Sequence, residues 1–345
     1  MVDQPFNPAD FAAEASGRLR IVLAGGSGQI GYMLASYFQQ QGHFVTVLTR
    51  SPFAMTWQTV HWDAQNPGPW TETLEGADVL INLTGRSINC RPTAANRQAI
   101  YETRIGSTLL LHKVLPTLQS PPKLWMNASA ATLYPRLTDE SGLDLPVDES
   151  CAVQGGDIVS TAPAPWRTRK GFTARVVRDW EAAFFSTPTP GTRKIALRSA
   201  VTFSPTPGNV FAVLSRLVRM SLGGSAGSGR QFVPWIHEED YARAVSFLIE
   251  HPELDGPFNL AAPNPIQNRP FMAALREAWD VPNGIPAPAF GIHLGAMLMN
   301  SNPELVLGSC RAIPGRLQSA GFRFLFPQWP QAANDLVRRW RQRQH

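Results

Sequence analysis

An α/β fold with a doubly wound parallel sheet is predicted by two observations. Short apolar runs typical of buried strands alternate with helical patterns over residues 19–204, and this alternation builds a parallel sheet. The first strand and helix are joined by a turn with three glycines spaced three residues apart. In such a sheet, ligands bind beyond the carboxyl ends of the strands. The 345-residue chain is long enough for this sheet and a smaller C-terminal lobe.

The glycine turn predicts a phosphate-binding site. The run RIVLAGGSGQIG occupies residues 20–31 and contains Gly25, Gly28 and Gly31. An apolar strand precedes the glycines, and an apolar-striped helical segment from Tyr32 to Gln41 follows them. Gly25 permits a tight turn, Gly28 lets the backbone approach a pyrophosphate, and Gly31 lets helix and strand pack closely. Amides at the helix N-terminus would hold the phosphates, so the turn indicates a Rossmann-type dinucleotide site.

The end of the second strand distinguishes between the two nicotinamide cofactors. The apolar run from Phe44 to Leu48 ends at Thr49, Arg50 and Ser51, about 20 residues after the glycines, where a Rossmann site contacts the adenosine ribose. An acid here would bind the 2′-hydroxyl of NAD. The chain has no acid at this place, and the Arg50 guanidinium suits bidentate contact with a 2′-phosphate. Arg50 therefore favours NADP(H) over NAD(H), the alternative being an ordinary solvated charge at a strand end.

Further strands and helices follow in alternation. The expected strands are Thr59–Trp62, Ala77–Leu83, Leu124–Asn127 and Ile195–Phe203, and the expected helices are Thr93–Leu118 and Phe172–Phe185. The segments that follow the strands should converge on one crevice at the carboxyl edge of the sheet. They are Gly25–Gly28, Thr49–Ser51, Asp63, Thr84–Gly85 and Ala128–Tyr134.

Three parts of the chain are expected. Residues 1–18 form a leader, residues 19–204 an NADP-binding Rossmann domain, and residues 205–345 a lobe on the substrate side, with segments near 233–262 returning to the main sheet. The expected helices of the lobe are Glu238–Glu250, Arg269–Trp279, Gly291–Met299, Pro303–Leu307 and Asn334–Arg341. His237 is expected to open the first of these helices and to anchor the lobe. Segments 134–166 and 222–232 lack periodicity. The second is interpreted as a hinge or lid that brings Arg230 to an anionic substrate group.

Composition excludes several classes of protein. Hydrophobic residues make up 43% of the chain and charged residues 17%, the balance of a globular protein. The net charge of +5 suits anionic small ligands and does not require nucleic acid, and no run of about 18 apolar residues predicts a membrane helix. Three widely spaced cysteines indicate neither a disulfide framework nor a zinc site. We therefore expect no metal, and we expect the protein to be cytoplasmic.

Several longer motifs carry a resemblance to a known family. NLTG at 82–85, ASAATLYP at 128–135 and WIHEED at 235–240 follow the glycine turn in order, as in extended short-chain dehydrogenases/reductases. With DWEAAF, GSGRQFVPWIH, NLAAPNP and GRLQSAGFRF added, residues 18–336 resemble the atypical "epimerase family protein" subgroup, which has its own C-terminal domain of unknown function. The resemblance implies a Rossmann fold and NADP(H) as cofactor.

The resemblance also implies roles for individual residues at the cofactor. The implied pyrophosphate contacts are Gly25, Gly28, Gln29 and Ile30, the 2′-phosphate contacts are Arg50 and Ser51, the adenine contact is Asp63, and the nicotinamide contacts are Leu83, Thr84, Gly85 and Ser129. Arg104 occupies a region of the long helix where the superfamily commonly uses an asparagine to support the site.

The usual catalytic pair of the superfamily is missing from this chain. Its reductions use a Tyr that moves a proton and a Lys four residues later that lowers the pKa of that Tyr. None of the five tyrosines has such a Lys, and the corresponding helix positions are Phe172 and Val176. Ser129 and Tyr134 remain as candidates to orient a carbonyl, with Lys170 supplying charge. A strand cap at Ser129 and a packed turn aromatic at Tyr134 are the structural alternatives.

Three functions fit these residues. The first is an oxidoreductase acting on a small carbonyl or hydroxyl substrate, in which NADPH carries the hydride. The second is a non-catalytic NADP(H)-binding sensor or scaffold. The third is a nucleotide-sugar-type epimerase or dehydratase, and the missing Tyr and Lys count most heavily against it. The expected partners are a small-molecule substrate and, by analogy, a second copy of the chain docked on the helices that begin near Thr93 and Phe172. Neither nucleic acid nor a membrane is an expected partner.

Overall fold

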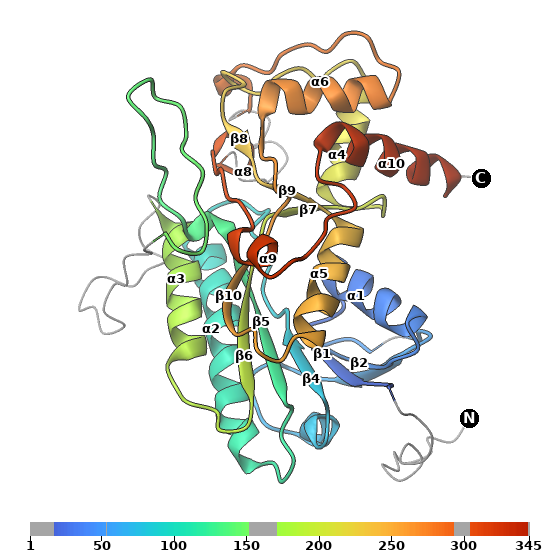
Figure 1. The fold of residues 1–345 in the computed structure, drawn as a ribbon, viewed down its shortest axis with the longest axis vertical. Coiled ribbons are helices and arrows are strands. Elements are labelled where there is room, and N and C mark those ends of the chain that lie inside the picture. The colour runs from blue at the N-terminus through green and yellow to red at the C-terminus, as the bar shows by residue number, and fades with distance from the viewer. Residues whose placement is uncertain (1–16, 53, 152–170, 293–303, 344–345) are drawn as a thin grey trace.

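A seven-stranded parallel sheet forms the centre of the structure (Figure 1). The structure is a computed structural model that describes residues 17–52, 54–151, 171–292 and 304–343. The strand order is β10-β6-β5-β4-β1-β2-β3, and every neighbouring pair is parallel. The strands are β1 (Arg20–Ala24), β2 (Phe44–Thr49), β3 (Gln58–His61), β4 (Val79–Asn82), β5 (Leu124–Ala130), β6 (Arg193–Ser199) and β10 (Gly256–Leu260). The order reverses between β1 and β4, and this reversal opens a crevice at their carboxyl ends.

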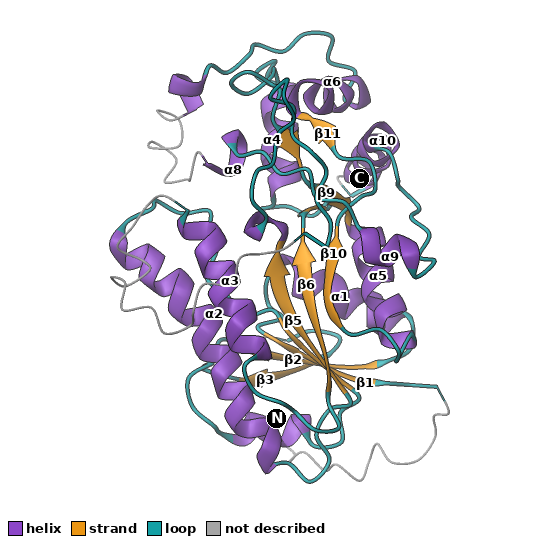
Figure 2. Ribbon diagram, turned by 60° about the vertical axis from the view of Figure 1, so that its left-hand side comes forward, coloured by secondary structure: helices purple, strands orange, loops and turns teal. Residues whose placement is uncertain are grey.

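Helices cover both faces of the sheet, which confirms the doubly wound fold (Figure 2). They are α1 (Gln29–Gln40), α2 (Ala94–Val114), α3 (Phe172–Phe185) and α5 (Glu238–Glu250). Successive side chains of one strand point to opposite faces, so Leu23 packs with α1 and α5 while Val22 packs with α2 and α3. Both faces are therefore buried at the centre of the sheet, and this burial explains why β1 and β4 are almost wholly apolar. Short 3₁₀ turns lie at η2 (Pro69–Leu74), η3 (Leu115–Thr117) and η4 (Ala131–Leu133).

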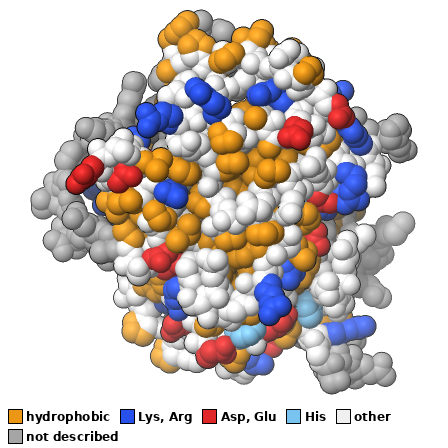
Figure 3. Space-filling model, turned by 45° about the horizontal axis from the view of Figure 1, so that its top comes forward, with side chains coloured by type: hydrophobic (Ala, Val, Ile, Leu, Met, Phe, Trp, Pro, Cys, Tyr) orange, Lys and Arg blue, Asp and Glu red, His pale blue; other side chains and the backbone are white. Residues whose placement is uncertain are grey.

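The C-terminal lobe has a core of its own, built around Trp329. The ring of Trp329 stacks on Phe271 with centroids 4.0 Å apart and also contacts Phe203 and Trp235. The elements of the lobe are α4 (Val210–Arg219), β8 (Phe232–Val233), β11 (Ile266–Gln267), α6 (Asn268–Ala278), α8 (Glu304–Leu307) and α10 (Trp329–Gln342). α9 (Gly315–Ser319) instead packs against β10, and its Leu317 belongs to the core of the main sheet. Figure 3 turns the top of the molecule in Figure 1 towards the viewer, and on this face hydrophobic side chains lie among scattered Arg and Lys side chains.

His237 joins the lobe to the sheet domain. Its Nδ1 accepts a hydrogen bond from Glu239 N (3.2 Å) and so caps the N-terminus of α5. Its Nε2 lies 3.2 Å from the carboxylate of Asp335 on α10. This is the expected role of His237, which opens the helix and anchors the lobe. β10 follows α5 and pairs with β6 at the edge of the main sheet.

The predicted extent of the strand Ile195–Phe203 is wrong. Instead of one strand over 195–203, the chain forms β6, which ends at Ser199, and β7 (Val201–Phe203), which pairs with β9 (Trp235–His237) outside the main sheet. Ala200 N still donates to Leu260 O on β10, whereas Val201 N donates to Pro234 O. This change of partner is set by a distant segment, so the apolar run itself does not reveal it. Helices α4 and α9 are also absent from the sequence prediction, and α10 begins five residues earlier than expected.

The glycine-rich segment 222–232 is packed against the chain around Ile285 and is not a free hinge. Gly224 N donates to Ile285 O (3.2 Å), and Gly227 N donates to Ala287 O (2.8 Å). A Cβ on Gly224 would lie 2.4 Å from the carbonyl carbon of Ile285. The glycines therefore permit close approach of two backbone segments. Arg230 is exposed at the end of this segment.

Several expectations fall on residues that the structure does not describe. They are the leader up to residue 16, residues 152–166 of the irregular loop, Lys170, and residues 293–299 of the expected helix 291–299. Within the described part of the chain, no helix is both long and apolar enough to cross a membrane.

Candidate cofactor-binding site

The turn after β1 requires glycine at its first position. Gly25 has a φ of +72°, a conformation that side chains disfavour. A Cβ at Gly25 would lie 2.7 Å from Thr84 Oγ1 and 2.8 Å from Thr84 Cα. Gly25 N donates to Leu48 O (2.9 Å), which fixes the turn above the end of β2. The absence of a side chain therefore lets the segments after β1 and β4 meet.

The other two glycines have different roles. A Cβ on Gly31 would lie 2.2 Å from Gly26 O, so Gly31 packs the first turn of α1 against the glycine turn itself. Gly28 is exposed, and a Cβ there would meet nothing within 4 Å. Among the described residues, no side chain caps α1 at Gly28, and its first turn has no acid. The amides at this end of α1 are thus open to an anion, which the helix dipole also favours.

Gln29 and Ile30 face away from this opening with their side chains. Gln29 Nε2 donates to Thr202 O on β7 (3.3 Å). Ile30 packs against the core beneath α1 and α5. Both residues therefore offer the turn their backbone N–H groups only.

The adenosine end of the crevice lies at the carboxyl ends of β2 and β3. Arg50 is exposed and makes no ion pair with any residue that the structure describes. Ser51 N bonds Thr49 Oγ1 (3.4 Å), and Thr49 O accepts from Trp62 N (2.9 Å), which brings Asp63 to the same edge. The carboxylate of Asp63 accepts hydrogen bonds from Gln65 N and both nitrogens of Asn66, and its contact with adenine stays a prediction. These hydrogen bonds lower the pKa of Asp63 to about 2 and give it a turn-forming role.

The other end of the crevice contains an unsatisfied hydroxyl. Leu83 N donates to Ala24 O (2.8 Å), and Thr84 N donates to Asn82 Oδ1 (3.1 Å), so the segment after β4 is fixed beside the glycine turn. Thr84 Oγ1 is buried and has no hydrogen-bond partner among the described residues. A buried hydroxyl without a partner costs free energy. A polar ligand group at this place would satisfy it, so the crevice fits a dinucleotide at this end as well.

Two buried asparagines that sequence reasoning did not single out support the segment after β4. Asn82 Nδ2 donates to Asn127 Oδ1 on β5 (2.8 Å). Thr108 on α2 bonds this pair, and its Oγ1 also accepts from Trp180 Nε1 on α3 (2.9 Å). The network ties two strands to two helices beneath the crevice. Asparagines within otherwise apolar strands are the sequence signal that could have found it.

Arg104 lies against Gly85, the last residue of the NLTG motif. A Cβ on Gly85 would lie 2.9 Å from the central carbon of the Arg104 guanidinium. Nη1 of Arg104 donates to Arg86 O (2.9 Å) and Ile100 O (3.0 Å), and the guanidinium lies 5.3 Å from the ring centre of Trp180. Burial lowers the pKa of Arg104 to about 10, so the group stays charged at neutral pH.

Ser129, the first catalytic candidate, is held by a carboxylate. Its Oγ donates to Glu181 Oε1 on α3. Arg198 on β6 binds the same carboxylate through Nε (2.9 Å) and Nη2 (2.7 Å), so Glu181 is fixed by a bidentate ion pair. Ser129 is itself buried at the carboxyl end of β5, on the strand beside the NLTG segment.

Tyr134, the second catalytic candidate, is enclosed in the protein. Its hydroxyl donates to Asn259 Oδ1 (2.7 Å) and accepts from Arg198 Nη1 (2.9 Å). The side chain is only 7% exposed, and burial raises its pKa to about 12 despite the neighbouring Arg198. This geometry favours the second interpretation of Tyr134, in which it is a packed aromatic side chain whose hydroxyl is hydrogen-bonded within the protein.

The positions of the missing catalytic pair are apolar. Phe172 and Val176 are buried against Ile100, between α3 and α2. Neither side chain can move a proton. The sequence comparison with the superfamily and the packing of α3 therefore agree that this chain lacks a Tyr and Lys pair here.

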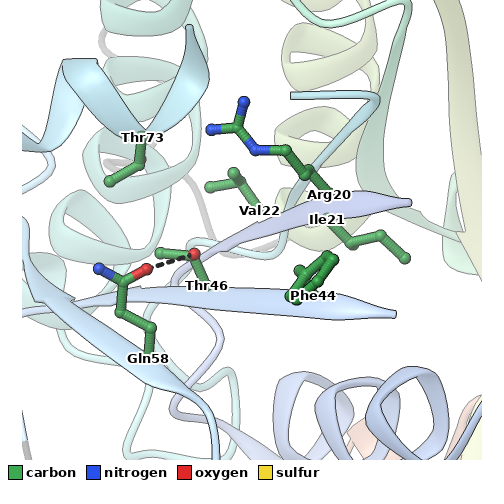
Figure 4. A pocket seen from close by; sticks show the side chains of 7 residues that line it. All are labelled: Arg20, Ile21, Val22, Phe44, Thr46, Gln58 and Thr73. Atoms are coloured by element: carbon green, nitrogen blue, oxygen red, sulfur yellow. Dashed lines mark hydrogen bonds between the residues drawn. The ribbon is translucent and has the colours of Figure 1, made fainter. Parts of the chain in front are cut away.

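Three cavities lie at the opposite edge of the sheet from the glycine turn. The small cavity in Figure 4, about 40 Å³, is lined at the start of β1 and β2 by Arg20 and Phe44, and Thr46 Oγ1 donates to Gln58 Oε1 beside it (2.9 Å). Two larger ones, of about 460 and 560 Å³, share Arg193 at the start of β6. None of them touches the glycine turn. Within the described ranges, no group of three or more His, Cys, Asp or Glu side chains is placed to hold a metal ion.

The open glycine turn at the strand-order reversal defines the class: this is a Rossmann-type nucleotide-binding protein. Comparison with protein families is more specific. Residues 21–261 match the NAD dependent epimerase/dehydratase family, and residues 287–336 match a domain of unknown function, DUF1731. The chain belongs to the NAD-dependent epimerase/dehydratase family.

Known relatives cover nearly the whole chain. An epimerase family protein of Mycobacterium leprae is 30% identical over 313 residues, covering 90% of this chain and 94% of the relative. The crystal structure of human epimerase family protein SDR39U1 with NADPH has a TM-score of 0.77 and 26% identity, covering 93% of this chain and 99% of that one. A nucleoside-diphosphate sugar epimerase from Corynebacterium glutamicum has a TM-score of 0.69 and 26% identity, covering 93% of this chain and 59% of that one. The resemblance inferred from the motifs is confirmed.

Proposed function

We propose that the chain binds NADP(H) in preference to NAD(H) and acts as an oxidoreductase on a small carbonyl or hydroxyl compound. The observation that carries the preference is Arg50, a cation without an ion pair in the described structure, at the adenosine end of the crevice where NAD-binding sites place an acid. The human relative crystallised with NADPH supports the same preference.

The chain would hold the cofactor at three places. The amides of Gly28 and Gln29 would bind the pyrophosphate, Arg50 and Ser51 the 2′-phosphate, and Thr84 Oγ1 the nicotinamide half. When bound, NADPH supplies a hydride. The hydroxyl of Ser129 lies beside the segment that ends at Gly85 and donates its proton to Glu181, which Arg198 holds in place. To orient a substrate carbonyl, Ser129 would turn this proton from Glu181 to the carbonyl oxygen.

The test of this proposal has two stages. We expect tight binding of NADPH by tryptophan quenching, weaker binding of NADH, and loss of the NADPH preference in Arg50→Ala. Glu239→Ala, a change at a half-buried acid on α5 that lies 3.9 Å from Arg339, is the control and should bind as the wild type does. The wild type is then incubated with NADPH and a set of aldehydes, ketones and keto acids. Oxidation of NADPH that requires one of these compounds supports the oxidoreductase, whereas failure to bind either nucleotide overturns the proposal.

A non-catalytic NADP(H) sensor or scaffold is favoured by one observation. The positions of the usual proton-transfer pair are filled by packed apolar side chains, and the hydroxyl of Tyr134 is satisfied by Asn259 and Arg198. The same experiment separates the two functions. Tight NADPH binding without turnover of any carbonyl compound supports the sensor.

A further inference from the structure

Arg104 presents a hydrogen-bonding edge that no described residue uses. A guanidinium has five N–H donors. Both donors of Nη1 are used by Arg86 O and Ile100 O, whereas Nε and Nη2 have no partner among the described residues. Neither of these nitrogens is among the fully enclosed unpaired atoms of the described residues. The free edge formed by Nε and Nη2 is the one that binds the two oxygens of a carboxylate or phosphate side by side.

The charge of Arg104 is not neutralised by the protein. The side chain is half-buried, and no carboxylate in the described structure lies within ion-pair distance of it. The acids on the adjacent face of α3 are occupied, because Glu181 binds Arg198 and Asp179 binds Tyr101 and Arg175. Leaving a partly desolvated charge uncompensated is costly. A bound anion would compensate it.

The position of Arg104 is fixed by its surroundings. Two backbone carbonyls hold one end of the guanidinium, and Trp180, itself held by Thr108, lies beneath it. The guanidinium lies against Gly85, an exposed residue of the segment that follows β4 at the carboxyl edge of the sheet. A cation fixed in this way loses little side-chain entropy when it binds.

We propose that Arg104 binds a negatively charged group of the substrate, a carboxylate or a phosphate, beside the nicotinamide end of the crevice. This inference rests on the proposed function, because it needs the cofactor to run from the glycine turn past Thr84. It restricts the substrate class to anionic carbonyl or hydroxyl compounds. The phosphates of the cofactor bind elsewhere in this arrangement, at the N-terminus of α1 and at Arg50.

The experiment uses the full chain saturated with NADP⁺, so that the glycine turn is filled. Propionate, methyl phosphate and the neutral isostere propionamide are titrated separately, with tryptophan fluorescence as the readout because Trp180 lies under Arg104. We expect at least one anion to bind and propionamide to bind at least about tenfold more weakly, as loss of a charge-assisted pair predicts. The anion that binds more tightly identifies carboxylate or phosphate.

Variants assign the effect to Arg104. With NADP⁺ raised until each variant is saturated, Arg104→Gln should weaken the anion at least about tenfold, and Arg104→Lys, which keeps the charge without the two-donor edge, should lie between. Arg86→Gln is the matched control, an exposed neighbouring cation whose loss should have little effect. Equal binding of propionamide, no binding of either anion, or undiminished anion binding in both Arg104 variants would each overturn the inference. If the wild type does not bind NADPH at all, the proposed function fails first.

Discussion

Thr84 Oγ1 stands where a side chain of residue 25 would have to be, 2.7 Å from the position of a Cβ on Gly25. The contact joins the turn after β1 to the segment after β4 across the reversal of strand order. It also places a buried hydroxyl, without a partner among the described residues, next to the N-terminus of α1. The glycine at position 25 and the hydroxyl at position 84 therefore meet at one point of the crevice.

Gly25→Ala and Gly28→Ala should separate the two roles of glycine in this turn. Gly25→Ala forces a side chain into a positive φ and against Thr84, so we expect the free energy of unfolding to fall by at least about 1 kcal/mol and NADPH binding to be lost. Gly28 has a φ of −81°, and a Cβ at this position would meet nothing within 4 Å. The free energy of unfolding of Gly28→Ala should therefore stay within about 0.5 kcal/mol of the wild-type value. The methyl group of Gly28→Ala would nevertheless occupy the space that a pyrophosphate needs, so this variant should bind NADPH more weakly. Urea unfolding measures the stability of both variants, and NADPH titration measures their binding. Equal losses of stability in the two variants would contradict the different roles of Gly25 and Gly28.

Tyr134→Phe should lower stability without affecting the cofactor. Removal of the hydroxyl leaves Asn259 Oδ1 without its donor and Arg198 Nη1 without its acceptor, which costs about 1–3 kcal/mol. NADPH affinity should be unchanged. Chemical denaturation and nucleotide titration of the same preparation provide the check. A variant of wild-type stability with abolished turnover would instead make Tyr134 a catalytic residue.

Val176→Lys should destabilise the protein rather than restore a reductase. Val176 is 2% exposed and packs with Phe172 and Ile100, so a lysine there buries an unpaired ammonium. The unfolding free energy should fall by about 3 kcal/mol or more. A stable Phe172→Tyr/Val176→Lys double variant that gains carbonyl reduction would show that the packing around α3 is less restrictive than the structure indicates.

Docking of α10 should weaken in acid. The imidazole of His237, together with Arg338 and Arg339, lowers the pKa of Asp335 from 3.8 to about 2. A carboxylate with a lowered pKa in the folded state stabilises the fold above its unfolded pKa, and this stabilisation is lost as the pH falls from about 4 towards 2. Asp335→Asn should therefore be less stable than wild type near neutral pH, with a difference that shrinks through this window. Unfolding curves at a series of pH values test this, and a pH-independent difference would show that the contact is not ionic.

Local signals predicted most of the sheet domain from sequence. β1, the glycine turn and α1 are contiguous, and apolar periodicity with glycine spacing defines them without reference to distant residues. Arg50 could be placed because the distance from the glycines to the end of the second strand is nearly constant in such sites. The match of residues 21–261 to the epimerase/dehydratase family agrees with the Rossmann fold predicted for this part of the chain.

The remaining features depend on contacts between distant segments. Tyr134 and Asn259 are 125 positions apart, and only the folded chain brings the phenol to the amide. Arg198 was a usable signal, because a charged residue inside an apolar strand needs a buried partner, and Glu181 in the DWEAAF motif supplies it. The division of β6 from β7 and the packing of segment 222–232 against Ile285 have no comparable local signature.

The preference for NADP(H) is tested most directly by the ratio of NADH and NADPH dissociation constants in wild type and Arg50→Asp. The account predicts that wild type binds NADPH at least about tenfold more tightly, a difference of about 1.4 kcal/mol. Arg50→Asp should reverse the preference, because an acid at this place repels the 2′-phosphate and binds the 2′-hydroxyl. An unchanged ratio in the variant, or a wild type that prefers NADH, would contradict the role assigned to Arg50.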